Sequence, residues 1–483
     1  MQKLFFVATF VVFSQLSIFA SSGNSQNIPY WSSKIKDMQT RFELAKRSTP
    51  ELIMFLRSMP KGGELHNHVC GASYTSFILE TAAKNKLNYD LTTNCFTKQE
   101  IDGKNIISLD QLMTNNKYLG KFRDISSMRG WKKNTTNGHD HFFDAFPHVF
   151  SAERTDNETL AEMAARNIYQ KVSYLELMAF CVPDNIAEKF YNPIKNFDIK
   201  DLDTSFMQLK PLIDNKEIAD AIVKYIDRRE DYIEKNLSNK YHWHIKGKNP
   251  DIVIRYIIPV ERERKSLKNF FIDCVMSIVA INADSRIVGM NVVAPEDYPY
   301  SYMNFQNQMK ILNYLWHKMG HPKFTLHAGE LVLNDSPVEA MWNRISDTIN
   351  IGHALRIGHG VDIAWERHPI KLLKEMKEKG IPVEICLSSN EGVLNKKGKD
   401  HPFSLYRRAG VPVCINTDDE GVTRSNLTME YVKAVQRYNL SYDELKKLIK
   451  NSIKYSFLPE KEKKALLGKV EKRIQDYENS FTS

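Results

Sequence analysis

Cysteine is scarce in this chain. Only six of its 483 residues are cysteine, and no two of them are spaced as Cys-x-x-Cys. This absence excludes zinc knuckles, thioredoxin-type redox chemistry and the class of nucleotide deaminases whose zinc ion is held by cysteines. Cys181, Cys386 and Cys414 lie in or beside apolar strand-like runs, which predicts buried free thiols at these positions. The spacing of the other three cysteines leaves their state open.

Long apolar runs are also missing, except near the amino terminus. There, a lone lysine, an apolar stretch over residues 4–13 and small residues around Ala20 form the pattern of a cleavable secretory signal. We therefore expect residues 1–22 to be a signal peptide and the mature protein to be secreted or periplasmic. A membrane anchor is the alternative, but the stretch is shorter than the roughly 20 residues that a spanning helix needs.

Acidic residues are outnumbered by basic ones. The chain has 67 lysines and arginines against 58 acidic residues, a formal net charge of +9. Such an excess could serve a polyanionic partner. The lysines are scattered, however, and the densest run, at 461–473, carries Leu466, Leu467 and Val470 at helical spacing. This spacing indicates an amphipathic terminal helix, and we expect no nucleic-acid partner.

Eight short apolar runs predict the strands of a parallel sheet. With 42% hydrophobic residues the chain can bury a large core. Helical patterns lie between most of the runs, so the predicted fold is α/β, a (β/α)8 TIM-type barrel with extra capping helices and loops. The predicted strands are 64–69, 174–181, 252–260, 287–293, 324–330, 356–360, 383–388 and 411–417.

The predicted barrel also sets the expected domain organisation. Residues 23–58 precede the first strand and are expected to form an amino-terminal helical extension. The barrel is expected to span 59–483. Two connections, near 90–150 and 184–250, are longer than a single helix requires, so we expect insertions there that cap the barrel mouth.

Several polar residues fall at the ends of the predicted strands, where active sites of such barrels are built. His66 and His68 are two residues apart on one strand, so their side chains point the same way. His327 and Asp418 end two later strands. Three imidazoles and one carboxylate can hold a zinc ion and leave a position open for water. We therefore predict one zinc ion per chain.

Three further residues are predicted to carry acid and base chemistry. His359 is a candidate base that orients and deprotonates water, Glu330 is a candidate acid, and Asp419 is expected to face the substrate. Each has an ordinary structural alternative: a tight turn for His359, and helix capping for Glu330 and for the Asp418–Asp419 pair. Those alternatives do not explain why all of these residues end strands of one barrel.

Seven motifs between Met59 and Gly421 carry a family resemblance. The chain resembles the adenosine and AMP deaminase branch of the metal-dependent amidohydrolases, and most of all its secreted, growth-factor-related adenosine deaminases. The signal pattern independently favours that secreted branch. The motifs are MPKGGELHNHVCGA, YLELM, IVGMNVVAPED, FTLHAGE, RIGHG, CLSSN and INTDDEG.

The resemblance implies a role for each matched residue. It makes Glu330 the proton donor to purine N1, His359 the water-orienting base and Asp419 a contact to purine N7. Ala294 would lie at the purine edge, and Glu176 would line the pocket or contact the sugar, with a buried salt bridge as the alternative. The implied zinc ligands are His66, His68, His327 and Asp418.

Some positions depart from the family pattern, and they bear on the substrate. Cys70 replaces an aspartate that contacts the sugar, Met178 an arginine, Asn291 an aspartate and Ala294 a glycine. The expected reaction is deamination of adenosine or 2′-deoxyadenosine to the inosine product and ammonia. AMP, a modified adenine nucleoside, another amide-like bond, or a secreted signalling role on the same barrel are the alternatives. The expected partner is a small purine nucleoside, and a homodimer stays open.

Overall fold

The protein is a (β/α)8 barrel, as predicted. The computed structural model describes residues 28–133, 137–263 and 266–481. All eight predicted runs form strands, which lie parallel in one sheet in the order β1-β5-β6-β7-β8-β9-β10-β11. These strands are β1 (Gly63–His68), β5 (Tyr174–Met178), β6 (Val253–Glu261), β7 (Ile287–Val293), β8 (Phe324–Ala328), β9 (Ala354–His359), β10 (Val383–Ile385) and β11 (Val413–Ile415).

The last strand meets the first through the backbone of the site residues themselves. Asn67 and Asp418 form a parallel bridge between β1 and the end of β11. The N–H of His68 donates to the carbonyl of Asp418 at 3.0 Å, and the N–H of Asp418 donates to the carbonyl of His66 at 3.1 Å. Closure of the barrel therefore brings the predicted ligands of β1 and β11 side by side.

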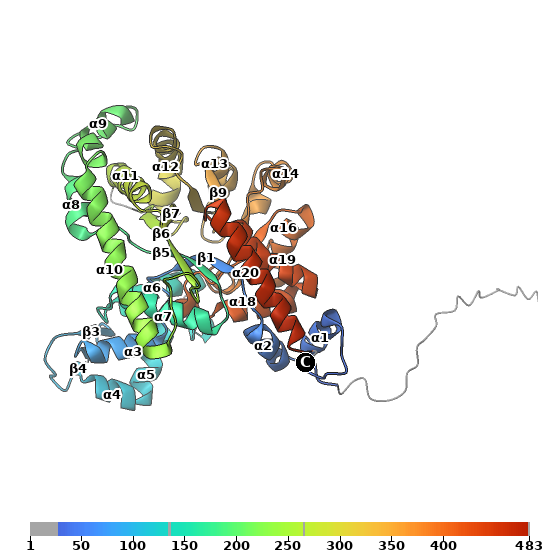
Figure 1. Cartoon of the computed structure of the whole chain (residues 1–483). Coiled ribbons are helices and arrows are strands. Elements are labelled where there is room, and N and C mark those ends of the chain that lie inside the picture. The colour runs from blue at the N-terminus through green and yellow to red at the C-terminus, as the bar shows by residue number, and fades with distance from the viewer. Residues whose placement is uncertain (1–27, 134–136, 264–265, 482–483) are drawn as a thin grey trace, which may run out of the picture.

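Helices surround the strands (Figure 1). The sequence sets where they begin: in α7, for example, Thr155 and Glu158 form a capping box, an arrangement worth about 1 kcal/mol. Gly320 ends the helical pattern after α12 with a positive φ of 83°. The outer helices are α7 (Asp156–Tyr169), α11 (Leu267–Ala283), α12 (Pro299–Lys318), α13 (Arg344–Asn350), α14 (Pro369–Lys379), α16 (Phe403–Ala409), α18 (Leu427–Tyr438) and α19 (Tyr442–Lys454).

The first insertion covers the barrel mouth on a small apolar core of its own. A three-stranded antiparallel sheet and α6 contribute buried side chains such as Tyr89, Phe96 and Phe142 to this core. Helix α6 packs against α15 (Leu387–Leu394) and α17 (Glu420–Thr423), which follow β10 and β11. The segment comprises α3 (Thr75–Lys84), β2 (Asn88–Asp90), β3 (Cys95–Thr97), β4 (Ile106–Ile107), α4 (Leu109–Thr114), α5 (Asn116–Ile125) and α6 (Gly138–Phe150).

The second insertion does not cap the mouth, and that prediction is wrong for its main helix. Helix α10 (Lys216–Tyr241) packs against α7 and α11 and takes the place of the outer helix between β5 and β6. In Figure 1 it runs along the side of the barrel. Its buried residues, which include Ile218, Ile222 and Ile226, explain this position because they form one apolar stripe at helical spacing. The other helices of this segment are α8 (Asp184–Tyr191) and α9 (Leu202–Ile213).

The chain ends lie outside the barrel. The predicted extension contains α1 (Met38–Ala45) and α2 (Thr49–Ser58), and α2 packs on α18. The predicted terminal helix is α20 (Glu460–Asn479), whose Arg473 contacts Ser173 at the amino-terminal end of β5. Among the described residues no helix has the length and apolar character needed to cross a membrane. The predicted signal peptide lies outside the described residues, and all six cysteines are free thiols.

Candidate metal and active site

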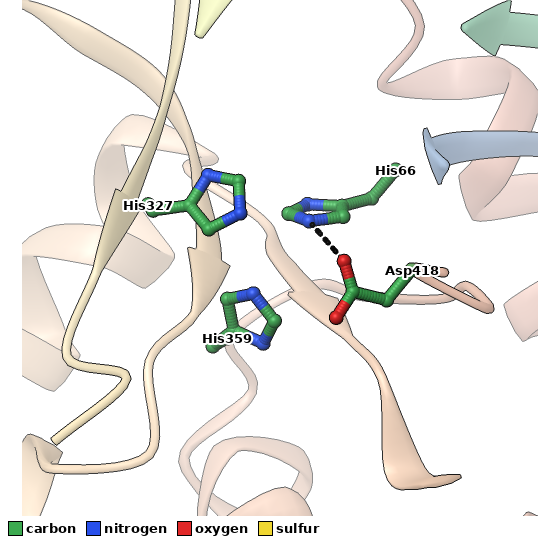
Figure 2. Close-up of side chains that lie close together, drawn as sticks. All are labelled: His66, His327, His359 and Asp418. Atoms are coloured by element: carbon green, nitrogen blue, oxygen red, sulfur yellow. Dashed lines mark ion pairs between the residues drawn. The ribbon is translucent and has the colours of Figure 1, made fainter. Parts of the chain in front are cut away.

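Three of the predicted metal ligands, His66, His327 and Asp418, lie together with His359 at the carboxyl-terminal ends of the barrel strands (Figure 2). His68 Nε2 lies 3.3 Å from His327 Nε2 and 3.2 Å from Asp418 Oδ1. His66 Nε2 lies 3.4 Å from the same carboxylate oxygen. A tetrahedral zinc site with bonds of about 2.0–2.1 Å places its ligand atoms about 3.3 Å apart. These three distances match that spacing. The side chains that could hold a metal ion form two overlapping groups, His66, His327, His359 and Asp418 in one, and His68, Asp418 and Asp419 in the other.

Two hydrogen bonds behind the ligands orient their rings. His66 Nδ1 lies 2.7 Å from Glu384 Oε2, and His327 Nδ1 lies 2.9 Å from Asn291 Oδ1. Because both acceptors are oxygens, each Nδ1 carries the proton, and the lone pair of Nε2 faces the cluster. His66 Nε2 is buried and has no hydrogen-bond partner within the described part of the chain, which is the state expected of a nitrogen shaped to bind a metal.

The electrostatics of the cluster favour a cation. Burial opposes protonation of His66, but the carboxylates of Asp418 and Glu384 outweigh it and raise its pKa to about 10. Burial would also raise the pKa of Asp418, yet the adjacent imidazoles of His66 and His68 hold that pKa well below its usual range. A positive charge among these side chains is therefore stabilised, and a divalent ion that displaces the proton would supply it.

Glu330 lies beside the cluster on a tightly bent loop. Gly329 before it has a φ of +80°, and a side chain at that position would overlap the carboxylate of Asp362. The N–H groups of Gly329 and Glu330 donate to the carboxylate of Glu296 at 3.2 Å and 2.9 Å. Glu296 is in turn fixed by Arg344, 3.0 Å away. Glu330 is thus positioned by its backbone, and its carboxyl is left for chemistry.

Burial also determines the protonation state of this carboxyl. It raises the pKa of Glu330 well above its usual range, and the negative charges of Asp418 and Glu296 add to the effect. This direction favours the protonated form of Glu330, which is the form that a general acid needs. Burial, followed by the charge of Asp418, raises the pKa of Asp419 in the same direction.

Three non-glycine residues at strand ends have backbone conformations that are costly for L-residues. Ala294, His359 and Asp418 have φ values of +79°, +65° and +66°. Such residues each cost about 1–3 kcal/mol and persist where the surrounding structure holds them.

Asp419 begins α17, but its side chain makes no capping hydrogen bond. Helix capping therefore does not explain this carboxylate.

A pocket of about 220 Å³ opens onto the cluster. Phenylalanines of α6 form one wall, so the first insertion does build the roof of the site. Larger hollows, such as one of about 450 Å³ between α16 and α19, lie away from the cluster. The lining residues are His68, Cys70, Phe142, Phe143, Phe146, Phe150, Glu261, Val293, Ala294, Pro295, His327, Glu330, Asp418 and Asp419.

Glu176 lies away from the pocket, and this position corrects the prediction that it lines the pocket or contacts the substrate. Its carboxylate is fully buried in an ion pair with Arg356, 2.7 Å away, and accepts a hydrogen bond from Tyr174 at 2.6 Å. It is not among the described residues that line the pocket. The alternative of a buried salt bridge is therefore the one that the structure shows, because the side chain turns toward the barrel axis below the cluster.

The sequence reasoning missed several residues that support the site. Glu384 holds His66, Glu296 holds the Glu330 loop, and Asn390 with His401 lies behind His359. A signal existed for Glu384, because an acidic residue within the apolar run PVEICL must find a buried partner. Glu296 had a similar signal, since it lies three residues after the predicted strand 287–293.

Comparisons with known proteins agree with this geometry. The family model described as adenosine deaminase matches residues 250–473. Adenosine deaminase from Enterococcus faecalis is 34% identical over 39% of this chain and 51% of its own length, so the chain spans about half of that relative. Adenosine deaminase from Clostridium perfringens is 26% identical over 62% of this chain and 78% of its own length.

Solved structures with this fold point the same way. The crystal structure of the Arabidopsis N6-mAMP deaminase superimposes with a TM-score of 0.56 at 18% identity, covering 87% of this chain and 99% of that chain. An amidohydrolase from Burkholderia ambifaria with bound Zn has a TM-score of 0.51 at 15% identity, covering 89% and 94%. At these identities the likeness concerns the fold.

A closed parallel barrel with imidazoles and carboxylates gathered at its strand ends is the architecture of metal-dependent hydrolases. The family match narrows this class to the aminohydrolases. Residues 250–473, a little under half of the chain, match the adenosine deaminase family model, and the curated relatives it resembles are adenosine deaminases. The individual roles assigned to His66, His68, His327, Asp418, Glu330, His359 and Asp419 stay predictions.

Proposed function

We propose that the protein hydrolyses the 6-amino group of adenosine or 2′-deoxyadenosine, with one zinc ion per chain. The observation that carries the proposal is geometric: the largely buried carboxyl of Glu330, whose pKa is raised, lines one pocket together with members of the histidine and aspartate cluster. In the reaction, a bond from oxygen to purine C6 forms and the bond from C6 to the amino nitrogen breaks. The products are inosine or 2′-deoxyinosine and ammonia.

The side chains divide the work by position. His66, His68, His327 and Asp418 would hold the ion, which would supply a nucleophile by lowering the pKa of water from about 16 to near 7. Glu330 delivers its proton to purine N1, so that the ring can become tetrahedral at C6 without building up negative charge. Asp419 also lines the pocket. Its carboxyl donates a hydrogen bond to purine N7, which can only accept.

The charge of the pocket supports a nucleoside over a nucleotide. Among the described residues that line it, none is lysine or arginine, while four are acidic: Glu261, Glu330, Asp418 and Asp419. A phosphate group calls for arginine or lysine and is repelled by carboxylates. AMP and its N6-methyl form are the second candidates, because the Arabidopsis structure is that of an N6-mAMP deaminase.

We also propose that the enzyme is exported and belongs to the secreted, growth-factor-related branch. The support is the signal pattern of residues 1–22. Cell fractionation of the full-length chain, with sequencing of the mature amino terminus, tests this: cleavage shortly after Ala20 is expected. An intact Met1 on a cytoplasmic product would contradict export without affecting the proposed reaction.

One preparation tests both metal and reaction. The purified protein is stripped with a chelator, reloaded with zinc, and assayed with adenosine, 2′-deoxyadenosine, AMP and N6-methyl-AMP by absorbance and by released ammonia. Turnover of the two nucleosides that is lost on stripping and restored by zinc is expected. Turnover confined to the two nucleotides would reject the proposed substrate. A cellular effect that survives in Glu330→Gln would indicate a signalling role.

A further inference from the structure

Three buried side chains form a hydrogen-bonded chain behind the site. His359 Nδ1 lies 3.0 Å from the side-chain nitrogen of Asn390, and the side-chain oxygen of Asn390 lies 3.0 Å from His401 Nε2. The chain ends at the backbone, where the N–H of Phe403 donates to His401 Nδ1 at 3.1 Å. His359 and Asn390 are fully buried, and His401 is 2% exposed. No other element of the proposed reaction uses Asn390 or His401.

The backbone N–H at the end of this chain determines the direction of every bond in it. A backbone N–H can only donate, so His401 Nδ1 must accept. A neutral imidazole with one accepting nitrogen carries its proton on the other, so His401 Nε2 donates to Asn390. The atom of Asn390 that faces His401 is therefore its oxygen, and the atom that faces His359 is its NH2 group. This group donates to His359 Nδ1, which must accept in turn.

Two features keep this direction from reversing. Burial lowers the pKa of His401 to about 3, and the nearby charge of Arg437 adds to the effect, so that ring stays neutral. Among the described residues, the contact of His359 Nδ1 that competes with Asn390 is Glu330 Oε1, at 3.5 Å. That contact is longer than the bond from Asn390, and an ionised Glu330 would be needed to draw a proton onto Nδ1.

We propose that Asn390 and His401 are positioning residues that lock His359 in the tautomer with its proton on Nε2. Nε2 is the ring nitrogen that faces the metal ligands in Figure 2. It is buried and has no hydrogen-bond partner among the described residues. The group that His359 presents to the reacting atoms is therefore a hydrogen-bond donor. Only the catalytic use of this donor rests on the proposed function; the tautomer of His359 does not.

The inference changes the role that the sequence analysis gave to His359. A neutral ring whose Nε2 already carries a proton cannot take a second one there, and its Nδ1 is held by the NH2 group of Asn390. His359 therefore orients the attacking oxygen by donating to it, so that an oxygen lone pair is directed at purine C6. It does not serve as the general base. A metal-bound water with a pKa of about 7 would ionise at neutral pH and release its proton without a histidine base.

The tautomer can be measured without any turnover. Histidine-selective ¹⁵N labelling and long-range proton–nitrogen correlation spectra report which ring nitrogen carries the proton, in the stripped and in the zinc-loaded full-length protein. We expect Nε2–H for His359 and for His401 in both forms. A spectrum with the proton on Nδ1 of His359 overturns the proposal, whether or not the protein deaminates adenosine. A correct tautomer in a protein that turns over no purine would reject the proposed function instead.

Two variants then test the hydrogen-bonded chain of His359, Asn390 and His401. Asn390→Asp replaces the NH2 donor by an oxygen, which draws a proton onto His359 Nδ1. We expect kcat to fall by about 10² to 10⁴, the range seen when a catalytic imidazole is held in the wrong tautomer, with KM changed less than about threefold. His401→Gln still offers a donor to Asn390 and should keep kcat within about tenfold of the native value. Equal losses in both variants, or an Asn390→Asp enzyme with native kcat, would contradict the proposed role of this hydrogen-bonded chain. If Asn390→Asp does not fold, the spectrum of the native protein decides.

Discussion

Two buried clusters of charged side chains, at opposite ends of the barrel interior, differ in how well their charges are matched. The lower cluster consists of Glu176, Arg356 and Glu384, and lies toward the amino-terminal ends of the strands. Arg356 is 2.7 Å from Glu176 and 2.5 Å from Glu384, and its guanidinium lies 3.9 Å from the centre of the Phe457 ring. Every charge in this cluster has an opposite charge at contact distance.

The upper cluster, at the mouth, lacks this balance. It joins His66, His68, His327 and Asp418 to Glu330 and Asp419, two largely buried carboxyls whose pKa values are raised. Buried atoms without a hydrogen-bond partner gather here, among them His66 Nε2, His359 Nε2 and Asp419 Oδ1. Unpaired buried polar atoms cost roughly 1–3 kcal/mol each, so a ligand that contacts them recovers part of that cost.

The difference shows that burial of charge has two uses within one barrel. At the lower end it closes a matched network that specifies the packing of β5, β9 and β10, and at the upper end it prepares groups for a ligand. This division agrees with barrels generally, where the carboxyl-terminal ends of the strands carry the chemistry. Glu384 belongs to both, since its other oxygen holds His66 at 2.7 Å.

The largest expected effect separates activity from stability. Glu330→Gln keeps the size of the side chain but removes the transferable proton, so kcat on adenosine should fall by about 10² to 10⁴ while Tm is unchanged within about 2 °C. Kinetics with calorimetry of the same samples measures this. Glu339→Gln, at an exposed position of the following segment, is the control and should behave as the native protein. A Glu330→Gln enzyme with native kcat would remove Glu330 from the mechanism.

Breaking the lower cluster should lower the stability of the fold, whereas Glu330→Gln should lower activity and leave stability unchanged. Arg356→Met leaves Glu176 and Glu384 buried without a partner, which should lower the free energy of unfolding by about 3–5 kcal/mol. Urea denaturation measures it. Arg255 lies on strand β6 and forms a more exposed ion pair with Glu462. Arg255→Met should therefore lower the free energy of unfolding by less than about 1 kcal/mol. Equal losses in the two variants would mean that burial of the network contributes nothing.

The lower cluster should also give the fold a particular sensitivity to acid. Burial alone would raise the pKa of Glu384, but Arg356 and His66 outweigh it and lower that pKa to about 2. The unfolded value is about 4.3, so the unfolded chain binds the proton more tightly. The stabilisation is therefore present above pH ~4.3 and is lost as the pH falls toward 2, on the order of 3 kcal/mol in total.

Denaturation of the native protein and of Glu384→Gln at several values between pH 6 and pH 3 isolates this contribution. Other carboxyls titrate in both proteins, so the difference between the two curves belongs to Glu384. The difference should shrink as the pH falls. A difference that is constant with pH would show that Glu384 is not ionised in the native state.

The link between the clusters predicts a smaller effect on metal binding. Glu384→Gln weakens the hydrogen bond that orients His66, so zinc affinity should fall by about 10- to 100-fold. Competition with a chromophoric chelator measures the affinity. Glu176→Gln is the matched control, because Glu176 pairs with the same arginine but does not contact His66. If both variants lose affinity equally, the effect comes from the barrel as a whole.

The sequence predicted the upper cluster far better than the lower one, for a physical reason. Parallel strands buried on both faces appear as apolar runs, and a polar residue at the end of each run must lie at the mouth. His66, His327 and Asp418 were found in this way. Arg356 and Glu176 lie within their strands, and their pairing depends on which strands face each other across the closed barrel. Spacing along the chain does not contain that information.

The same distinction explains the error on the second insertion. The length of this segment suggested a cap. Length alone does not distinguish a helix that covers the mouth from one that replaces an outer helix. The apolar stripe of α10 explains why this helix packs as an outer helix. The support of His359 by Asn390 and His401 was missed for a related reason. The two residues are eleven positions apart and converge only because α15 and the segment before α16 fold back together.

The smallest predicted effect concerns Asn291, which stands where the family pattern has aspartate. Its side-chain oxygen accepts from the Nδ1–H of His327 at 2.9 Å and from the backbone N–H of His327 at 3.0 Å. Asn291→Asp keeps both bonds and adds a negative charge that makes the ligand ring more basic, so zinc affinity should rise by less than about tenfold. Chelator competition measures this, with Gln308→Glu, buried on α12 and bonded to the carbonyl of Arg262, as a control for added buried charge. An unchanged affinity in Asn291→Asp would show that the neutral amide already orients His327 as well as a carboxylate does, and that the upper cluster owes its affinity to the spacing of its ligands.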